Sequence, residues 1–256
     1  MKRPAVVAAL TTPFRDGVVD RDAIFAHADF LADAGVDALM PCGTTGEGPL
    51  LDDEELARMI EVTVAAARGR VRVLAHVGRP STQASVFMAR RALGAGADGV
   101  SAVVPYYYAY TDEQLLRHYS ALIAAGDGAP TYAYTIPART GNELSAELVR
   151  TLAAEGLKGV KDSTKSWERH LEYLACGVDV LIGTDAMVVD SLRAGSAGCV
   201  SALANVRPDL LCAARDGADV QAEITELRSH LPFPKLKAAV AERIPGYPTA
   251  YRSPLG

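Results

Sequence analysis

The feature that most constrains the fold of this chain is the alternation of short apolar runs with longer stretches of helical spacing. The apolar runs have the length of β-strands and do not alternate with polar residues. Strands with this pattern are buried on both faces, as in the parallel sheets of α/β proteins. The predicted strands are Ala5–Leu10, Ala38–Pro41, Val71–Val77, Gly99–Val104, Thr131–Tyr134, Leu157–Val160, Val178–Ile182 and Cys199–Ala202.

Amphipathic helices are predicted between these strands. Two of them begin with a capping box, formed by Asp52 with Glu55 and by Thr111 with Gln114. Glycines such as Gly35 follow several helices, as the turns from helix to strand require. The predicted helices are Asp20–Ala34, Asp53–Arg68, Thr82–Gly94, a helix that begins after Thr111, Ala146–Ala154, Trp167–Ala175, Ala186–Ala194 and Pro208–Arg215.

Eight strands and eight helices in strict alternation predict an α/β fold, a (β/α)8 TIM barrel over residues 1–216. Residues 217–256 remain as a short C-terminal helical extension, with helices expected at Val220–His230 and Lys235–Arg243. The alternative is an open doubly wound sheet, which needs a glycine fingerprint after the first strand. The sequence there is Thr11-Thr12-Pro13-Phe14, so the barrel is the better prediction.

Charge and cysteine content limit the partners and the location of the chain. The net charge is -5, with positive charges scattered, so we expect no nucleic-acid partner. The first apolar run is too short for a signal sequence or a membrane span, and we expect a cytoplasmic protein without a membrane partner. The cysteines are far apart and form no metal-ligand pattern, so we expect buried thiols and no bound metal. They are Cys42, Cys176, Cys199 and Cys212.

Reactive residues gather where the predicted strands end. In a (β/α)8 barrel the carboxyl ends of the strands meet at one rim, and the active site lies there. We therefore expect a site on this rim. Its candidate residues are Gly43, Thr44, Thr45, Tyr107, Tyr134, Arg139, Lys161, Asp185 and Ser201.

Lys161 is the most informative of these residues, because a lysine at the end of an inner strand is costly unless it is paired or used. Burial disfavours the charged amine, lowers its pKa and leaves the free base that Schiff-base chemistry requires. The alternative is a structural ion pair with the adjacent Asp162. Spacing alone leaves both interpretations open.

The tyrosines and the glycine-rich turn have both structural and functional interpretations. Two tyrosines on neighbouring strand ends, with a threonine hydroxyl, can relay protons around an amine. The run Tyr106–Tyr108 is equally consistent with a packing cluster or a subunit contact. The turn at residues 43–48 is either a plain loop or a nest of N–H and hydroxyl donors for a carboxylate or phosphate. Its spacing does not match a nucleotide-binding motif.

The histidines are dispersed along the chain, and only His76 is expected near the rim. No second histidine or carboxylate clusters with it in the sequence, which disfavours a metal-dependent aldolase. We expect His76 to be a structural histidine whose hydrogen bonds are satisfied.

Three motifs in this order resemble those of the dihydrodipicolinate synthase / N-acetylneuraminate lyase family. The similarity runs from Ala5 to about Val206. The motifs are Gly43-Thr44-Thr45-Gly46-Glu47, Tyr134-Thr135-Ile136-Pro137-Ala138-Arg139-Thr140-Gly141 and Gly159-Val160-Lys161-Asp162.

The resemblance implies a class I aldolase that uses pyruvate or a 2-keto acid and an aldehyde, with no metal or other cofactor. Lys161 would form the Schiff base, and Tyr134 beside it would move protons. Thr44 would link Tyr134 to Tyr107, which a neighbouring subunit of a homo-dimer or tetramer would lend. Thr44 and Thr45 would hold the pyruvate carboxylate. An iminium stabilises the carbanion, so a metal is not needed.

The substrate is less well defined by the sequence. Arg139 resembles the arginine with which dihydrodipicolinate synthases bind the aldehyde's carboxylate. Thr135 replaces the family's usual Asn, and Gly48-Pro49-Leu50 looks more like aldolases of 2-keto-3-deoxy sugar acids. Sialic acid lyases carry an acidic pair after the seventh strand. Here Asp185 is followed by Ala186, which disfavours sialic acid as the substrate.

Three functions therefore stay open. One is the cleavage of a 2-keto-3-deoxy acid, and another is the condensation of pyruvate with aspartate semialdehyde, as in a true 4-hydroxy-tetrahydrodipicolinate synthase. The third is a keto-acid-binding barrel without catalysis. The C-terminal region is shorter than is usual in the family, which weakens the inference of a tetramer or of an allosteric lysine site.

Overall fold

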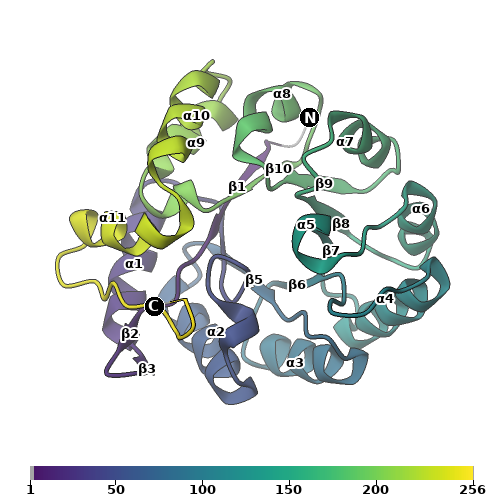
Figure 1. Ribbon diagram of the computed structural model, residues 1–256, viewed down its shortest axis with the longest axis horizontal. Coiled ribbons are helices and arrows are strands. Elements are labelled where there is room, and N and C mark those ends of the chain that lie inside the picture. The colour runs from purple at the N-terminus through teal and green to yellow at the C-terminus, as the bar shows by residue number, and fades with distance from the viewer. Residues whose placement is uncertain (1–2, 256) are drawn as a thin grey trace.

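Eight parallel strands close into a barrel in the computed structural model, which describes residues 3–255 (Figure 1). Around the barrel the strands follow the order β1-β10-β9-β8-β7-β6-β5-β4. This confirms the predicted (β/α)8 barrel and rules out the open sheet. The barrel strands are β1 (Ala5–Ala9), β4 (Ala38–Met40), β5 (Arg72–His76), β6 (Gly99–Val103), β7 (Thr131–Thr135), β8 (Gly159–Asp162), β9 (Asp179–Ile182) and β10 (Gly198–Ser201).

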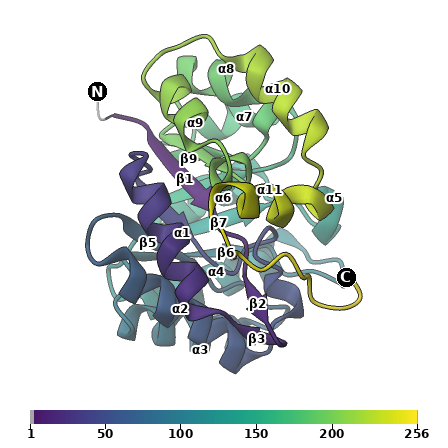
Figure 2. The ribbon, with the colours of Figure 1, turned by 90° about the vertical axis from the view of Figure 1, so that its left-hand side faces the viewer.

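The helices form the outer layer of the barrel (Figures 1 and 2). Both predicted capping boxes are present, with Asp52 accepting from the N–H of Glu55 and Thr111 from that of Gln114. Gly35, which follows the first helix, has a φ of 83°, as its predicted role in the turn requires. The barrel helices are α1 (Arg21–Asp33), α2 (Asp53–Ala67), α3 (Thr82–Gly94), α4 (Asp112–Gly126), α6 (Ala146–Ala154), α7 (Trp167–Leu174), α8 (Val188–Arg193) and α9 (Pro208–Arg215).

Local structure differs from the sequence prediction at several rim positions. A small hairpin of β2 (Phe14–Arg15) and β3 (Val18–Val19) follows β1, and its strands are too short for a periodicity to reveal. A one-turn helix, α5 (Pro137–Thr140), follows β7. The strand expected at Leu157–Val160 begins at Gly159 and continues through Asp162. The helix expected at Ala186–Ala194 is a 3-10 turn at Asp185–Met187 followed by α8.

The C-terminal region forms α10 (Gln221–His230) and α11 (Leu236–Arg243). Leu236 and Val240 of α11 belong to a buried apolar cluster that includes Ala23 of α1. Beyond α11 the chain returns to the rim, where it lies near the β2–β3 hairpin and α2 (Figure 1). Both predicted C-terminal helices are therefore present, and the domain boundary between residues 216 and 217 stays a prediction.

The barrel interior is filled by a small apolar cluster that includes Val7, Met40, Leu74 and Leu181. A larger cluster fills the layer between the strands and the helices. These two layers fix the strand ends and thereby the rim residues. Within residues 3–255 no helix is both long and apolar enough to cross a membrane.

Candidate active site

Lys161 and Tyr134 lie side by side inside the barrel. They pair directly in the register of β8 with β7, so both side chains point to the same side of the sheet. The Lys161 Nζ atom is 3.9 Å from the centroid of the Tyr134 ring and 3.7 Å from the Met40 Sδ atom. The amine thus lies between an aromatic face and a thioether at the mouth of the barrel.

Burial controls the electrostatics of Lys161, which is 5% exposed. Desolvation lowers the pKa of this amine, and interactions with Tyr134 and Asp185 partly oppose that effect. Among the described residues no carboxylate is within ion-pair distance of Nζ, and the hydrogen-bond contact of Nζ is Met40. The environment therefore favours a neutral, nucleophilic amine.

Asp162 does not pair with Lys161, so the structural ion pair considered from the sequence is wrong. Successive residues of a strand point to opposite faces, and Asp162 faces the helix layer. Its Oδ2 atom is 2.8 Å from Nδ1 of His170, and its Oδ1 atom accepts a 2.7 Å bond from the hydroxyl of Thr164. The amine of Lys161 is left without the counter-ion that its neighbour in sequence offered.

The glycine-rich turn after β4, residues 43–48, is called the threonine turn below. The Gly43 carbonyl accepts from the N–H groups of Gly46 at 3.0 Å and Gly48 at 3.1 Å, which closes the turn. A Cβ atom on Gly48 would lie 1.8 Å from the Cys42 carbonyl oxygen, so only glycine fits there. The Thr44 Oγ1 atom is 3.5 Å from the Tyr134 hydroxyl.

The threonine turn presents free donors at the rim. Within the part of the chain that the structure describes, the N–H groups of Thr44 and Thr45 donate to no protein acceptor. Successive unpaired N–H groups in a turn form a concave site for an anion. Because Thr44 also contacts Tyr134, this anion site lies next to the Lys161 amine.

Asp185 and Ser201 lie on the same rim, Asp185 in the 3-10 turn that follows β9 and Ser201 at the end of β10. The Ser201 hydroxyl donates a 2.6 Å hydrogen bond to the Asp185 carboxylate. Burial raises the pKa of Asp185, whereas Ser201, Arg228 and Lys161 act in the opposite direction. The Gln221 side chain of α10 donates to the Asp185 carbonyl at 2.9 Å, so the C-terminal region helps to hold this turn.

Comparison with known proteins assigns this barrel to a family. The model of the Dihydrodipicolinate synthetase family matches residues 2–231. The chain belongs to the dihydrodipicolinate synthetase family. This confirms the family that the three motifs predicted, and members of this family are lyases of the class I aldolase type.

Relatives within the family share much of the chain. An uncharacterized DapA-like lyase of Halobacterium salinarum is 42% identical over 214 residues, which cover 80% of this chain and 69% of that protein. The 4-hydroxy-tetrahydrodipicolinate synthase of Geobacter sulfurreducens is 36% identical over 238 residues, covering 91% of this chain and 82% of that protein. The crystal structure of dihydrodipicolinate synthase from Aquifex aeolicus superposes with a TM-score of 0.91 at 32% identity, over 99% of this chain and 92% of that one.

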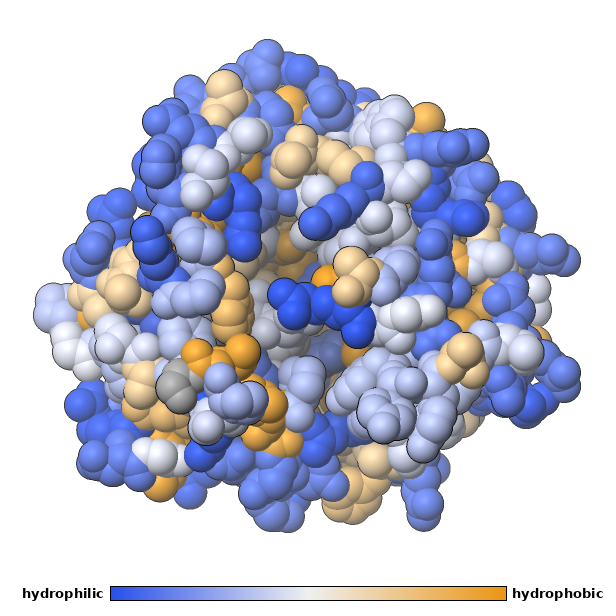
Figure 3. All heavy atoms as spheres, in the orientation of Figure 1, coloured by the Kyte–Doolittle hydropathy of each residue, from blue (hydrophilic) through white to orange (hydrophobic). Residues whose placement is uncertain are grey.

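Two residues that the family resemblance singled out are not packed into the site of this chain. Tyr107 is 84% exposed, and its ring makes a T-shaped contact with Tyr108, which is 66% exposed. A packing cluster beneath a loop is therefore wrong for these two tyrosines. Arg139 is an exposed residue of α5, the short helix that lies over the strand ends (Figure 1). Hydrophilic side chains also surround and cross the hollow at the centre of this face (Figure 3).

Two rim residues near the site had weaker signals in the sequence. His76 packs edge-on against Tyr134, and burial with the charges of Lys161 and Arg79 lowers its pKa to about 3. Its buried Nδ1 atom has no hydrogen-bond partner among the described residues, so the expectation of a satisfied histidine is wrong. Arg79 braces the threonine turn by donating to the Gly48 carbonyl at 3.2 Å and to Asp53 at 2.7 Å.

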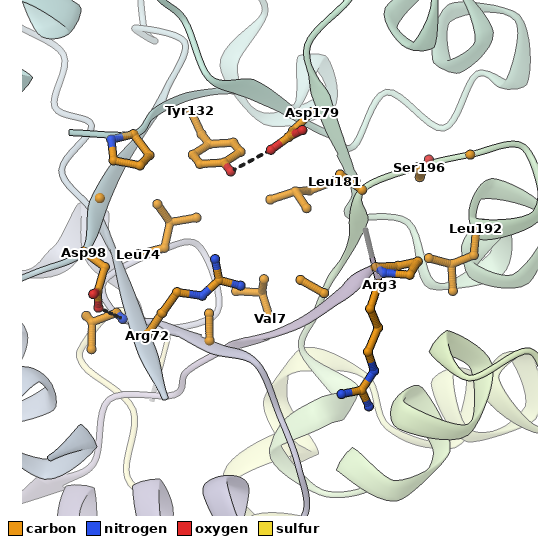
Figure 4. Close-up of a pocket in the computed structure, with 18 residues that line it drawn as sticks. Arg3, Val7, Arg72, Leu74, Asp98, Tyr132, Asp179, Leu181, Leu192 and Ser196 are labelled. Atoms are coloured by element: carbon orange, nitrogen blue, oxygen red, sulfur yellow. Dashed lines mark hydrogen bonds between the residues drawn. The ribbon is translucent and has the colours of Figure 1, made fainter. Parts of the chain in front are cut away.

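A cavity of about 380 Å³ lies at the opposite end of the barrel (Figure 4). Val7, Leu74 and Leu181 form its apolar wall, Arg72 points into it, and Tyr132 donates to Asp179 at 3.3 Å. None of the candidate site residues lines this cavity. The chemistry of a family member belongs to the rim, where the strands end, so this cavity is separate from the candidate active site.

Proposed function

We propose that this family member forms a Schiff base between Lys161 and the keto carbon of pyruvate or a 2-keto acid. The Nζ atom attacks the ketone carbon, a C–N bond forms, and the keto oxygen leaves as water after proton transfer. The resulting iminium accepts the electron pair of the C–C bond that breaks in the cleavage direction. In the condensation direction it loses a proton from the carbon next to the imine carbon, and the enamine so formed attacks an aldehyde. The observation that carries this proposal is a buried lysine on the rim whose amine has no counter-ion.

Tyr134 and the threonine turn have complementary roles in this proposal. The Tyr134 hydroxyl exchanges protons with the reacting carbonyl and passes them to Thr44, which lies at 3.5 Å. The free N–H groups of Thr44 and Thr45, beside Gly43, hold the carboxylate of the keto acid. In this proposal the keto carbon lies between the amine and the phenol.

The second substrate binds toward the outer rim. We propose that Arg139, exposed on α5, binds an acidic group of the aldehyde, and that Asp185 with Ser201 contacts its hydroxyl or carbonyl groups. This is compatible with cleavage of a 2-keto-3-deoxy acid. The second candidate is the condensation of pyruvate with aspartate semialdehyde, which is favoured by relatives that bear the name of the synthase.

We further propose a homo-oligomer in which Tyr107 completes the site of a neighbouring subunit. Its exposed position and its aromatic contact with Tyr108 support this role, because aromatic residues are enriched in subunit contacts. Thr44 would then connect Tyr107 of one subunit to Tyr134 of the next. A cytoplasmic location is also proposed, supported by four buried cysteines that are free thiols.

The Schiff base is tested by treating the protein with pyruvate and borohydride. The substrate is tested in a separate assay of pyruvate release from a panel of 2-keto-3-deoxy acids by the untreated protein. Irreversible inactivation that depends on both reagents is expected. Protection or turnover across the panel, compared with condensation of pyruvate and aspartate semialdehyde, then separates the two substrate classes. A folded protein that neither reacts with pyruvate nor turns over any substrate would favour a non-catalytic keto-acid-binding barrel.

A further inference from the structure

Glu47 is the last residue but one of the threonine turn, and it directly precedes Gly48. Its backbone has a φ of 59°, a left-handed conformation that few residues other than glycine adopt. The whole residue is only 1% exposed, although its side chain carries a carboxylate. A buried carboxylate in a strained turn requires partners, and both partners come from the C-terminal region.

Lys237 of α11 supplies the first partner. Its Nζ atom is 2.5 Å from the Glu47 Oε1 atom, and both side chains are fully buried. The same amine donates to the Ala250 carbonyl at 2.6 Å and lies 4.4 Å from the centroid of the Tyr251 ring. The position of this charge is thereby fixed by several independent contacts.

Arg252 supplies the second partner through its backbone. Its N–H donates to the Glu47 Oε2 atom at 2.7 Å, and its guanidinium pairs with Glu55 of α2. The chain between α11 and this residue lies over the rim near α2 (Figure 1). Both oxygens of Glu47 are therefore held by a segment far away in the sequence.

We propose that Lys237, acting through Glu47, is a positioning residue for carboxylate binding by the threonine turn. The proposal rests on the proposed function, because the turn would hold the carboxylate of a keto acid. The buried ion pair fixes the backbone of Glu47, which directly follows Thr44, Thr45 and Gly46. Small displacements of positioned groups weaken binding strongly, and the N–H groups of the two threonines are aimed by this backbone.

The test compares pyruvate binding by calorimetry for the wild type, Lys237→Met and Lys235→Met, in the full chain. Lys235 is an exposed lysine next to α11 and serves as the matched control. Lys237→Met is expected to raise the Kd of pyruvate by about tenfold or more, as misplacement of binding groups does. Lys235→Met should leave it unchanged, and Lys237→Arg should restore part of the affinity.

A second variant keeps the test decisive if Lys237→Met does not fold. Glu47→Gln/Lys237→Met removes both buried charges, a change that folded proteins often tolerate. It should fold and still bind pyruvate weakly. Wild-type pyruvate affinity in either folded variant would overturn the positioning role.

A structural role alone would lower the number of binding sites or the melting temperature and leave the Kd unchanged. Calorimetric binding without a borohydride adduct in the wild type would reject the Schiff base, and the affinity comparison would still test Lys237. Absence of pyruvate binding in the folded wild type would overturn both proposals.

Discussion

Lys161 and Lys237 are both buried lysines with opposite surroundings. Each lies over a tyrosine ring, with the Nζ atom 3.9 Å from the Tyr134 centroid and 4.4 Å from that of Tyr251, respectively. Desolvation lowers the pKa of both amines. The difference is the counter-ion, because Lys237 has Glu47 at 2.5 Å and Lys161 has the Met40 sulfur at 3.7 Å.

In the proposed function, this difference separates a structural lysine from a reactive one. A buried ammonium is stable when a carboxylate and further acceptors surround it, and its electron pair is then unavailable. An amine buried without an anion loses its proton more readily and can attack a carbonyl. Burial alone therefore does not indicate catalysis, and the absence of a counter-ion within the described chain is what distinguishes Lys161.

The largest expected effect is the loss of activity on removing the Lys161 amine. Lys161→Met should lower turnover by at least about 10⁴-fold, because no other group can form the imine. The fold should persist, because the substitution removes no ion pair. Steady-state assays together with circular dichroism measure both effects, and substantial residual turnover in a folded variant would refute the assignment.

Removal of the other lysine should act on stability. Lys237→Met leaves the Glu47 carboxylate buried without its ion partner, and breaking such a pair costs about 3–5 kcal/mol of unfolding free energy. Urea denaturation of this variant measures the loss, with the exposed Lys235→Met as the control. An unfolding free energy equal to that of the wild type would mean that the pair contributes nothing to folding.

The pH dependence of the Lys161 amine provides the next comparison. An ordinary lysine with a pKa of about 10.4 is only about 0.4% neutral at pH 8. Since burial lowers the pKa of Lys161 from 10.5, its neutral fraction should rise at lower pH than that of an ordinary lysine. Nitrogen-15 NMR of the lysine side chains can follow this titration, and a Lys161 midpoint at or above 10.5 would contradict the argument.

The smallest effect is expected at Arg139, which lies outside the buried lysine sites. Arg139→Ala should raise the KM for an acidic aldehyde by about tenfold, as expected for the loss of a charged hydrogen bond. Trapping of the pyruvate imine should be preserved, because Arg139 is exposed and its proposed contact is with the aldehyde and not with pyruvate. Equal losses in both assays would show that Arg139 shapes the whole site.

The sequence predicted the parts of this molecule that depend on local patterns. The capping residues Asp52 and Thr111 act within a few residues, and the apolar runs define the strands of the barrel. Lys161 was recognisable because a lysine at the end of an apolar strand conflicts with the pattern around it. The motifs that surround it also predicted the family.

Other features depend on contacts that no local pattern records. Glu47 and Arg252 are 205 positions apart and meet only when the C-terminal region folds over the rim. The direction of Asp162 follows from strand alternation once the bounds of β8 are known, and the shifted strand prediction obscured it. The role proposed for Tyr107 requires a second subunit, and within one chain this side chain is exposed.

The most direct measurement is to map the lysine that carries the reduced pyruvyl group after treatment with pyruvate and borohydride. Peptide mass spectrometry distinguishes the six lysines of the chain. The adduct is expected on Lys161 alone, with Lys237 unmodified because Glu47 holds it as an ammonium ion. An adduct on Lys237, or none on any lysine of the folded protein, would contradict the conclusion that the unpaired buried amine is the reactive one.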